Sequence, residues 1–151
     1  MRIFIFALIL IVSLGCIYGQ KSTTPKTKLM LYAYPINSFT KIPITKKSIK
    51  DAATFKKKIK NGNEFILKFE SLLKNQEVLN EPTEIKTNVR IYIEVLINNK
   101  IENTIVLNKW KNVEYKGKCF NVNQEIMDLI LGLFPLDKRG EYTPISVKDE
   151  E

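Results

Sequence analysis

The chain has 151 residues, of which 44% are hydrophobic and 26% are charged, and its formal net charge is +8. This size allows one globular domain and excludes a multidomain machine. The chain contains no histidine, which excludes Ser-His-Asp and Cys-His catalysis and every histidine-ligated metal or haem site.

The N-terminus has the layout of a secretory signal. A single arginine precedes an unbroken apolar run at residues 3–12, and small residues follow this run. A positive start, a short apolar core and small residues are typical of a signal peptide. We therefore expect an exported protein, periplasmic or extracellular, whose signal peptide at residues 1–19 is cleaved between Gly19 and Gln20.

Two alternatives stay open for this N-terminal segment. Residues 14–16 (Leu-Gly-Cys) resemble a bacterial lipobox in which Cys16 is lipidated, although the residues at 13 and 14 depart from the usual pattern. An uncleaved signal would anchor the chain instead, because its 18 uncharged residues reach the lower limit of about 17–25 residues for spanning a bilayer. After cleavage only Cys119 remains, so we expect no internal disulfide.

The first part of the predicted mature chain reads as a tether followed by a strand. Residues 20–28 (QKSTTPKTK) are polar and lack an apolar period, which indicates a flexible tether. Residues 29–36 (LMLYAYPI) are apolar and aromatic, which predicts a strand, and this strand should lie toward a sheet edge if Pro35 is part of it. We expect a single α+β domain at residues 29–135.

The next segment allows two interpretations. An apolar stripe predicts a helix at residues 46–57, and helical spacing of phenylalanine and leucine predicts another at residues 63–75. The alternative is a hairpin, in which a strand at residues 54–59 turns at Asn61-Gly62 into a strand at residues 64–69. The sequence leaves the choice of helix or hairpin at residues 54–69 open.

A period-two pattern begins at Val89. Apolar residues alternate with mainly polar ones up to residue 97, which predicts a strand with one buried face and one mainly polar face. Short turns to further strands at residues 101–108, 112–115 and 118–120 indicate an antiparallel meander over about residues 87–120.

The predicted fold closes with a helix. Asn123 is a good N-cap, and Pro135 ends the apolar stripe that follows it. Residues 136–151 are polar and end in three acidic residues, so we expect a disordered tail. The expected fold class is α+β, with an antiparallel sheet of three to four strands and two or three helices packed on one face.

Positive charge is concentrated near the start of the predicted mature chain. Residues 21–60 carry a net charge of +10, whereas residues 61–151 carry −3. Such a segment is typical of a surface that meets an anion, such as lipid headgroups or an acidic protein, although lysines on a helix can also simply be solvated. The candidate binding lysines are Lys46, Lys47, Lys50, Lys56, Lys57, Lys58 and Lys60.

The polar face of the predicted strand is a second candidate binding surface. Arg90, Tyr92 and Glu94 alternate with the apolar residues, so they should project together toward solvent and could bind another protein. An antiparallel sheet needs no partner on such a face. Trp110 is either an exposed anchor for a partner or an aromatic side chain folded over the sheet edge.

Catalysis is the least favoured function class, and we expect no catalytic residue, no metal site and no cofactor. Cys119 lacks a histidine to stabilise its thiolate, so a core position is expected. Two carboxylates among Glu94, Glu102 and Glu114 could support glycoside hydrolysis without histidine. The chain has no cysteine pair at metal-binding spacing and no EF-hand loop.

The hypothesis from the sequence is a small exported, non-enzymatic binding protein whose partner is unknown. One alternative is a binder of anionic envelope surfaces through residues 41–60, and a weaker one is a carboxylate-dependent hydrolase. Nucleic acid is a disfavoured partner, because export separates the protein from it. Membrane anchoring is expected only through a lipid or an uncleaved signal.

Overall fold

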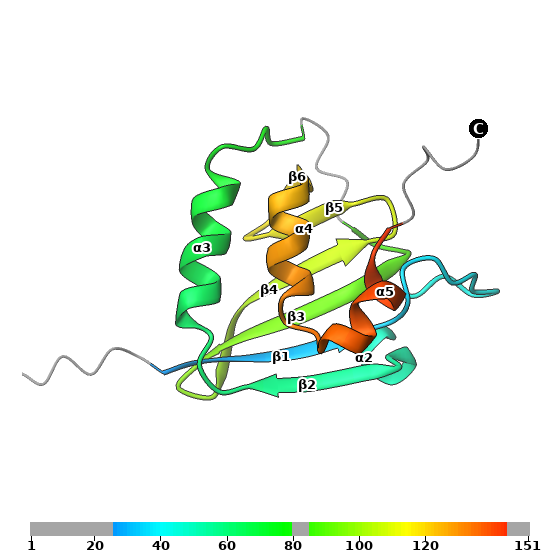
Figure 1. The fold of residues 1–151 in the computed structure, drawn as a ribbon, viewed down its shortest axis with the longest axis horizontal. Coiled ribbons are helices and arrows are strands. Elements are labelled where there is room, and N and C mark those ends of the chain that lie inside the picture. The colour runs from blue at the N-terminus through cyan, green and yellow to red at the C-terminus, as the bar shows by residue number, and fades with distance from the viewer. Residues whose placement is uncertain (1–25, 80–84, 145–151) are drawn as a thin grey trace, which may run out of the picture.

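The chain folds around a six-stranded antiparallel sheet with the strand order β2-β1-β3-β4-β5-β6, seen in the computed structural model (Figure 1). The structure describes residues 26–79 and 85–144. The expected signal peptide, its cleavage site at Gly19 and Gln20, and the alternative lipidation site at Cys16 lie outside these residues.

The α+β class and the antiparallel sheet are confirmed, but the expected number of strands was wrong. The last four strands form the expected meander, and two N-terminal strands extend it, since β1 pairs with both β2 and β3. Pro35 does not make β1 an edge strand, because the strand ends before it. The strands are β1 (Thr27–Ala33), β2 (Phe55–Ile59), β3 (Val89–Ile97), β4 (Lys100–Asn108), β5 (Asn112–Tyr115) and β6 (Lys118–Asn121).

Helices lie on both faces of the sheet, although helices on one face were expected. The two longest lie side by side on one face (Figure 1), and a one-turn helix lies against β1 and β3 on the other. The helices are α2 (Ile49–Ala52), α3 (Asn63–Leu73), α4 (Gln124–Leu131), the 3₁₀ turn η1 (Leu136–Lys138) and α5 (Arg139–Tyr142). Asn123 caps α4 as predicted, since its side chain accepts the backbone N–H of Ile126.

The ambiguous segment combines the two interpretations. The predicted helix at residues 46–57 survives only as α2, and β2 replaces its second half because Phe55 and Ile59 pack against the main core. The predicted helix at residues 63–75 is confirmed as α3. Gly62 lies between them where a Cβ atom would come within 2.7 Å of Leu29 Cγ, so a close approach of the chain explains this glycine.

The main hydrophobic core lies between the sheet and the pair α3 and α4. Inward-facing residues of β1, β3, β4 and β5 pack against both helices, with Phe69 and Ile130 fully buried at the contact. The C-terminal turns add to this core, because Tyr142 stacks on Phe134 with ring centroids 4.4 Å apart. Residues 136–144 therefore belong to the folded unit and not to the expected disordered tail.

A smaller core lies on the opposite face. Ile44 and Ile49, from the segment between β1 and β2, pack with Val89, Val106 and Cys119 of the sheet. Val89 was expected on the other face together with Ile91, but an irregularity in the register between these two residues places Val89 in this second core.

Candidate functional site

The predicted polar face of β3 is covered by other parts of the chain. Arg90 is 1% exposed and Glu94 is 4% exposed, whereas Tyr92 is half-buried. The cover consists of the segment between β1 and β2, which crosses this face and carries α2. The expectation that these three side chains project together into solvent was therefore wrong.

Glu94 is the centre of a polar cluster under this cover. One carboxylate oxygen pairs with the Lys50 ammonium, and the other accepts a hydrogen bond from the Tyr32 hydroxyl at 3.4 Å. Lys50 Nζ also lies 5.6 Å from the ring centroid of Tyr32 and 5.8 Å from that of Tyr92. Burial raises the pKa of both tyrosines, and the hydrogen bond to Glu94 raises the pKa of Lys50. At neutral pH the cluster is one ion pair flanked by two neutral phenols.

Glu114 holds the same covering segment at a second point. Its Oε1 atom lies 2.7 Å from Lys46 Nζ, and its Oε2 atom accepts the backbone N–H of Ile85 at 3.0 Å. Glu94 and Glu114 are thus each paired with a lysine of the cover, while Glu102 is exposed. This arrangement provides no pair of free carboxylates for glycoside hydrolysis.

Arg90 fixes the start of the covering segment. Its guanidinium donates to the carbonyl oxygens of Ile36 at 3.4 Å, Ser38 at 3.1 Å and Val89 at 3.2 Å, and it lies 5.5 Å from the ring centroid of Tyr34. Burial lowers the pKa of this guanidinium. Arg90 therefore positions the loop that begins at residue 37.

The seven candidate lysines do not form one surface. Lys46 and Lys50 face carboxylates of the sheet, and Lys57 donates to the carbonyl oxygen of Leu133 at 2.8 Å, near the end of α4. Lys56 and Lys58 are exposed on the edge strand β2, where lysines protect the free edge against pairing with other strands. Lys60 is exposed just after β2, and Lys47 is exposed near the start of α2.

The structure reveals another lysine-rich surface at the end of the sheet where β3 begins. Three segments meet there, at residues 37–47, 85–88 and 109–111, and we call them the loop-end surface. The backbone N–H of Val89 donates to Ile44 in the first segment, and that of Lys109 donates to Asn88 in the second. The loop-end surface contains six lysines and no acidic residue.

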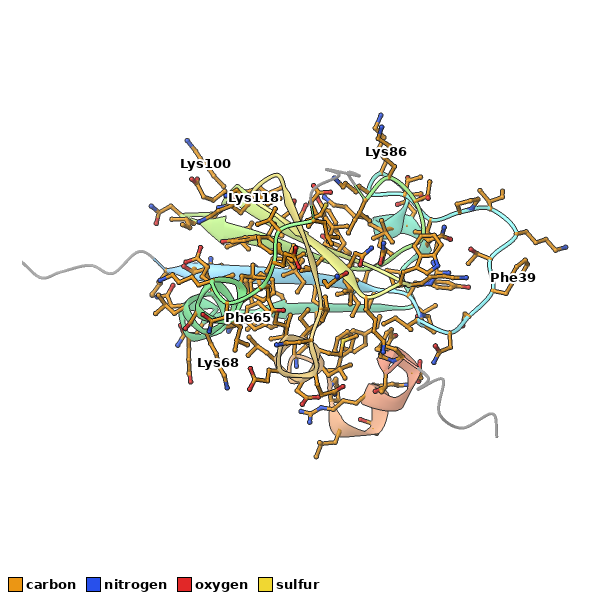
Figure 2. The ribbon with its side chains drawn as sticks, turned by 90° about the horizontal axis from the view of Figure 1, so that it is seen from above. Phe39, Phe65, Lys68, Lys86, Lys100 and Lys118 are labelled. Carbon is orange, nitrogen blue, oxygen red and sulfur yellow. The ribbon has the colours of Figure 1, made fainter. Side chains whose placement is uncertain are left out.

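Large apolar side chains protrude from the loop-end surface. Phe39 is 87% exposed and Ile42 is 80% exposed on a loop that projects from the body of the molecule (Figure 2). Trp110 is 56% exposed between Lys109 and Lys111, which favours the anchor over the side chain folded against the sheet edge.

The turn that carries Trp110 is held in place by the sheet. Asn108 is buried, and its Oδ1 atom accepts the backbone N–H groups of Trp110 at 3.0 Å and Asn112 at 2.9 Å. The sequence named Trp110 as one of two alternatives, an anchor or a side chain folded over the edge, and gave no indication of Phe39 and Ile42. The available signal was that these two apolar residues stand in a proline-containing loop without any period that would direct them to a core.

In residues 26–79 and 85–144, no three side chains of the histidine, cysteine, aspartate and glutamate types are grouped to hold a metal ion. None of the helices described here has the length and apolar character needed to cross a membrane. No protein-family model, curated protein or solved structure matched the chain.

Proposed function

We propose that this protein is a non-enzymatic binding module that docks on anionic membrane surfaces through its loop-end surface. The observation that carries the proposal is the exposure of Phe39 and Ile42, 87% and 80%, on either side of Lys41. Removing a large apolar side chain from water stabilises a complex by about 1.5–3 kcal/mol. Transfer of the loop tip into an apolar phase is therefore favourable.

The charge around these side chains favours a negatively charged occupant. The loop-end surface has six lysines and no acidic residue, but Lys46 already pairs with Glu114 of the sheet. Each lysine that faces an anionic membrane contributes about 1 kcal/mol. Lys109 and Lys111 flank Trp110, and tryptophan is enriched at the level of the lipid headgroups because its ring is apolar and its N–H is polar.

The shape of the loop-end surface favours a membrane over a protein partner. Its apolar side chains are separated by lysines and stand on protruding loops, whereas the centre of a protein interface is depleted in charge. Export, which the N-terminal sequence predicts, would bring this surface close to anionic headgroups. The proposal keeps the anionic-surface hypothesis, but of the seven lysines named for it only Lys46 and Lys47 lie on the loop-end surface.

Sedimentation with lipid vesicles tests the apolar part of the proposal. The exported protein should bind vesicles of phosphatidylglycerol and phosphatidylcholine at least tenfold more tightly than phosphatidylcholine alone, because about 1 kcal/mol per lysine is lost without anionic lipid. The double variant Phe39→Ser, Ile42→Ser should lose most of this binding. Leu67→Ser is the matched control, since Leu67 is 69% exposed on α3, away from the loops. Equal binding by the double variant and the control would refute the proposal.

A second comparison tests the charged part. Replacing Lys41, Lys109 and Lys111 with glutamine should weaken vesicle binding and make it less sensitive to salt. The control removes three lysines near β2 instead, by replacing Lys56, Lys58 and Lys60 with glutamine. If both triple variants lose affinity equally, binding follows the net charge of the protein and the loop-end surface has no special role.

A further inference from the structure

A groove separates α3 from α4 on the helix-covered side of the molecule. It has a volume of about 640 Å³ and is open to solvent. The two helices that form it lie side by side in Figure 1, with β2 below their ends. Its apolar wall is formed by Ile59 of β2 together with Phe65, Leu72, Leu129 and Leu133.

The rim of the groove is acidic, although the protein as a whole is basic. Glu64, Glu125 and Asp128 line it together with Lys68, and Lys57 Nζ lies 2.8 Å from the carbonyl oxygen of Leu133 in its wall. The local charge is therefore −1 in a chain of net charge +8. Within the described residues none of the three carboxylates forms a salt bridge, and Asp128 accepts a hydrogen bond from Gln124 at 2.8 Å. These acidic groups remain available to a cationic ligand.

We propose that this groove binds a cationic amphipathic helix of a partner protein. A helix laid between two others buries its apolar stripe against their facing side chains, and its flanking lysines or arginines would reach the three acidic residues. The 11 residues of α3 and 8 residues of α4 extend about 12–16 Å at 1.5 Å per residue, which accommodates two to three turns of the partner. This binding is separate from the membrane docking proposed above.

The direct test uses a defined probe peptide. The probe is a fluorescent 14-residue helix of leucine and lysine, with leucines at positions i, i+3, i+4 and i+7. Binding should be saturable in fluorescence anisotropy, and the amide resonances that shift should belong to residues 59–72 and 124–133. Shifts confined to other parts of the protein would overturn the proposal.

Matched variants show whether the acidic rim recognises the probe. Replacing Glu64, Glu125 and Asp128 with their amides should weaken binding about tenfold at low salt, because each exposed charge pair contributes up to about fivefold. The control amidates three exposed acidic residues away from the groove, Asp51, Glu77 and Glu102. A control variant that binds as weakly as the rim variant would overturn the proposal, since attraction would then depend only on net charge.

Two other occupants of the groove are distinguishable. The residues before β1 are one, because the Thr27 carbonyl accepts the N–H of Gly62, next to Asn61 of the groove. If removal of residues 20–25 raised the probe affinity severalfold, that segment would be the occupant and the partner helix would be refuted. The second alternative occupant is another copy of this chain. A dimer that dissociates when the rim is amidated would also refute the partner helix.

Discussion

The two faces of the sheet are covered by different means. On one face, α3 and α4 bury a continuous apolar core and satisfy their own backbone hydrogen bonds. On the other face, the cover is mainly loop with one turn of helix, and side chains hold it through Arg90 and two lysine–glutamate pairs. An irregular segment can thus cover a sheet when side chains of the sheet bond to it, as Arg90 does to its carbonyl groups and the two glutamates do to its lysines.

A carboxylate, a tyrosine and a lysine meet on each face of the sheet. On the helix face Glu70 accepts hydrogen bonds from Tyr115 at 2.8 Å and Lys116 at 2.7 Å, and its side chain is 34% exposed. On the loop face the Glu94 side chain is only 6% exposed. The same side-chain types therefore form a peripheral contact on one face and a buried one on the other.

The largest expected effect concerns the helix face. Phe69 is fully buried, stacks on Phe65 and meets the Tyr115 ring edge-to-face, so Phe69→Ala should lower the free energy of unfolding by about 3–5 kcal/mol. Urea denaturation measures this loss. Leu67→Ala, on the exposed side of the same helix, should cost less than about 1 kcal/mol. Similar losses for both variants would show that this face does not depend on its apolar core.

Arg90→Met tests the loop face. The variant removes donors to three carbonyl groups but keeps much of the side-chain volume, so we expect a loss of about 2–3 kcal/mol in the free energy of unfolding. Hydrogen exchange should also accelerate at residues 36–38, which Arg90 holds in place. Arg139→Met is the control, because Arg139 donates to one carbonyl group, that of Phe134. An unchanged exchange rate at residues 36–38 would contradict the positioning role of Arg90.

Periodic patterns explain why much of the fold could be predicted from the sequence. The alternation in β3 and the Asn123 cap report local geometry, so they identified a strand and a helix start correctly. β2 lacks such a signal, because Lys56, Lys57 and Lys58 are consecutive and its two apolar ends match a helix as well as a strand. Its pairing with β1 is a contact between distant residues that no local pattern encodes.

The candidate site was harder to predict for the same reason. The sequence marked Arg90 and Glu94 as polar and therefore exposed, yet the loop that buries them is distant in the chain and has no apolar period. Trp110 was named from its position at the end of a predicted strand, which left open whether it is exposed or folded over the sheet edge. Residues 37–47 and 109–111 lie at one end of the sheet because both bond to the start of β3, and this follows only from the strand order.

The two lysine–glutamate pairs of the loop face should contribute unequally. Glu94→Gln removes the more deeply buried carboxylate and should cost about 1–2 kcal/mol of unfolding free energy, and Glu114→Gln about 1 kcal/mol. Urea denaturation of the two variants measures these losses in unfolding free energy. The pKa of Lys50 is raised in the folded state, so its contribution is complete below the pKa of an unfolded lysine and disappears as the pH rises through the folded value. Equal costs would show that burial does not decide the strength of these pairs.

The smallest effect at neutral pH is expected from Tyr115→Phe, which removes one hydrogen bond to Glu70 and should cost about 0.5–1 kcal/mol. The effect of Tyr115→Phe on the free energy of unfolding at alkaline pH is more informative. Burial and the hydrogen bond to Glu70 raise the pKa of Tyr115 from 10.0 to about 12, so the folded state binds this proton more tightly than the unfolded state. The resulting stabilisation is complete below pH 10 and lost between pH 10 and about 12.

Urea denaturation across this alkaline range checks the effect. The native protein should lose stability more steeply than Tyr115→Phe, so the two curves should converge as the pH approaches about 12. Tyr32→Phe provides the comparison on the loop face, where burial also raises the tyrosine pKa. If Tyr115→Phe and the native protein lost stability in parallel, Tyr115 would bind its proton equally tightly in the folded and unfolded states. The helix-face contact would then lack the hydrogen bond that defines it.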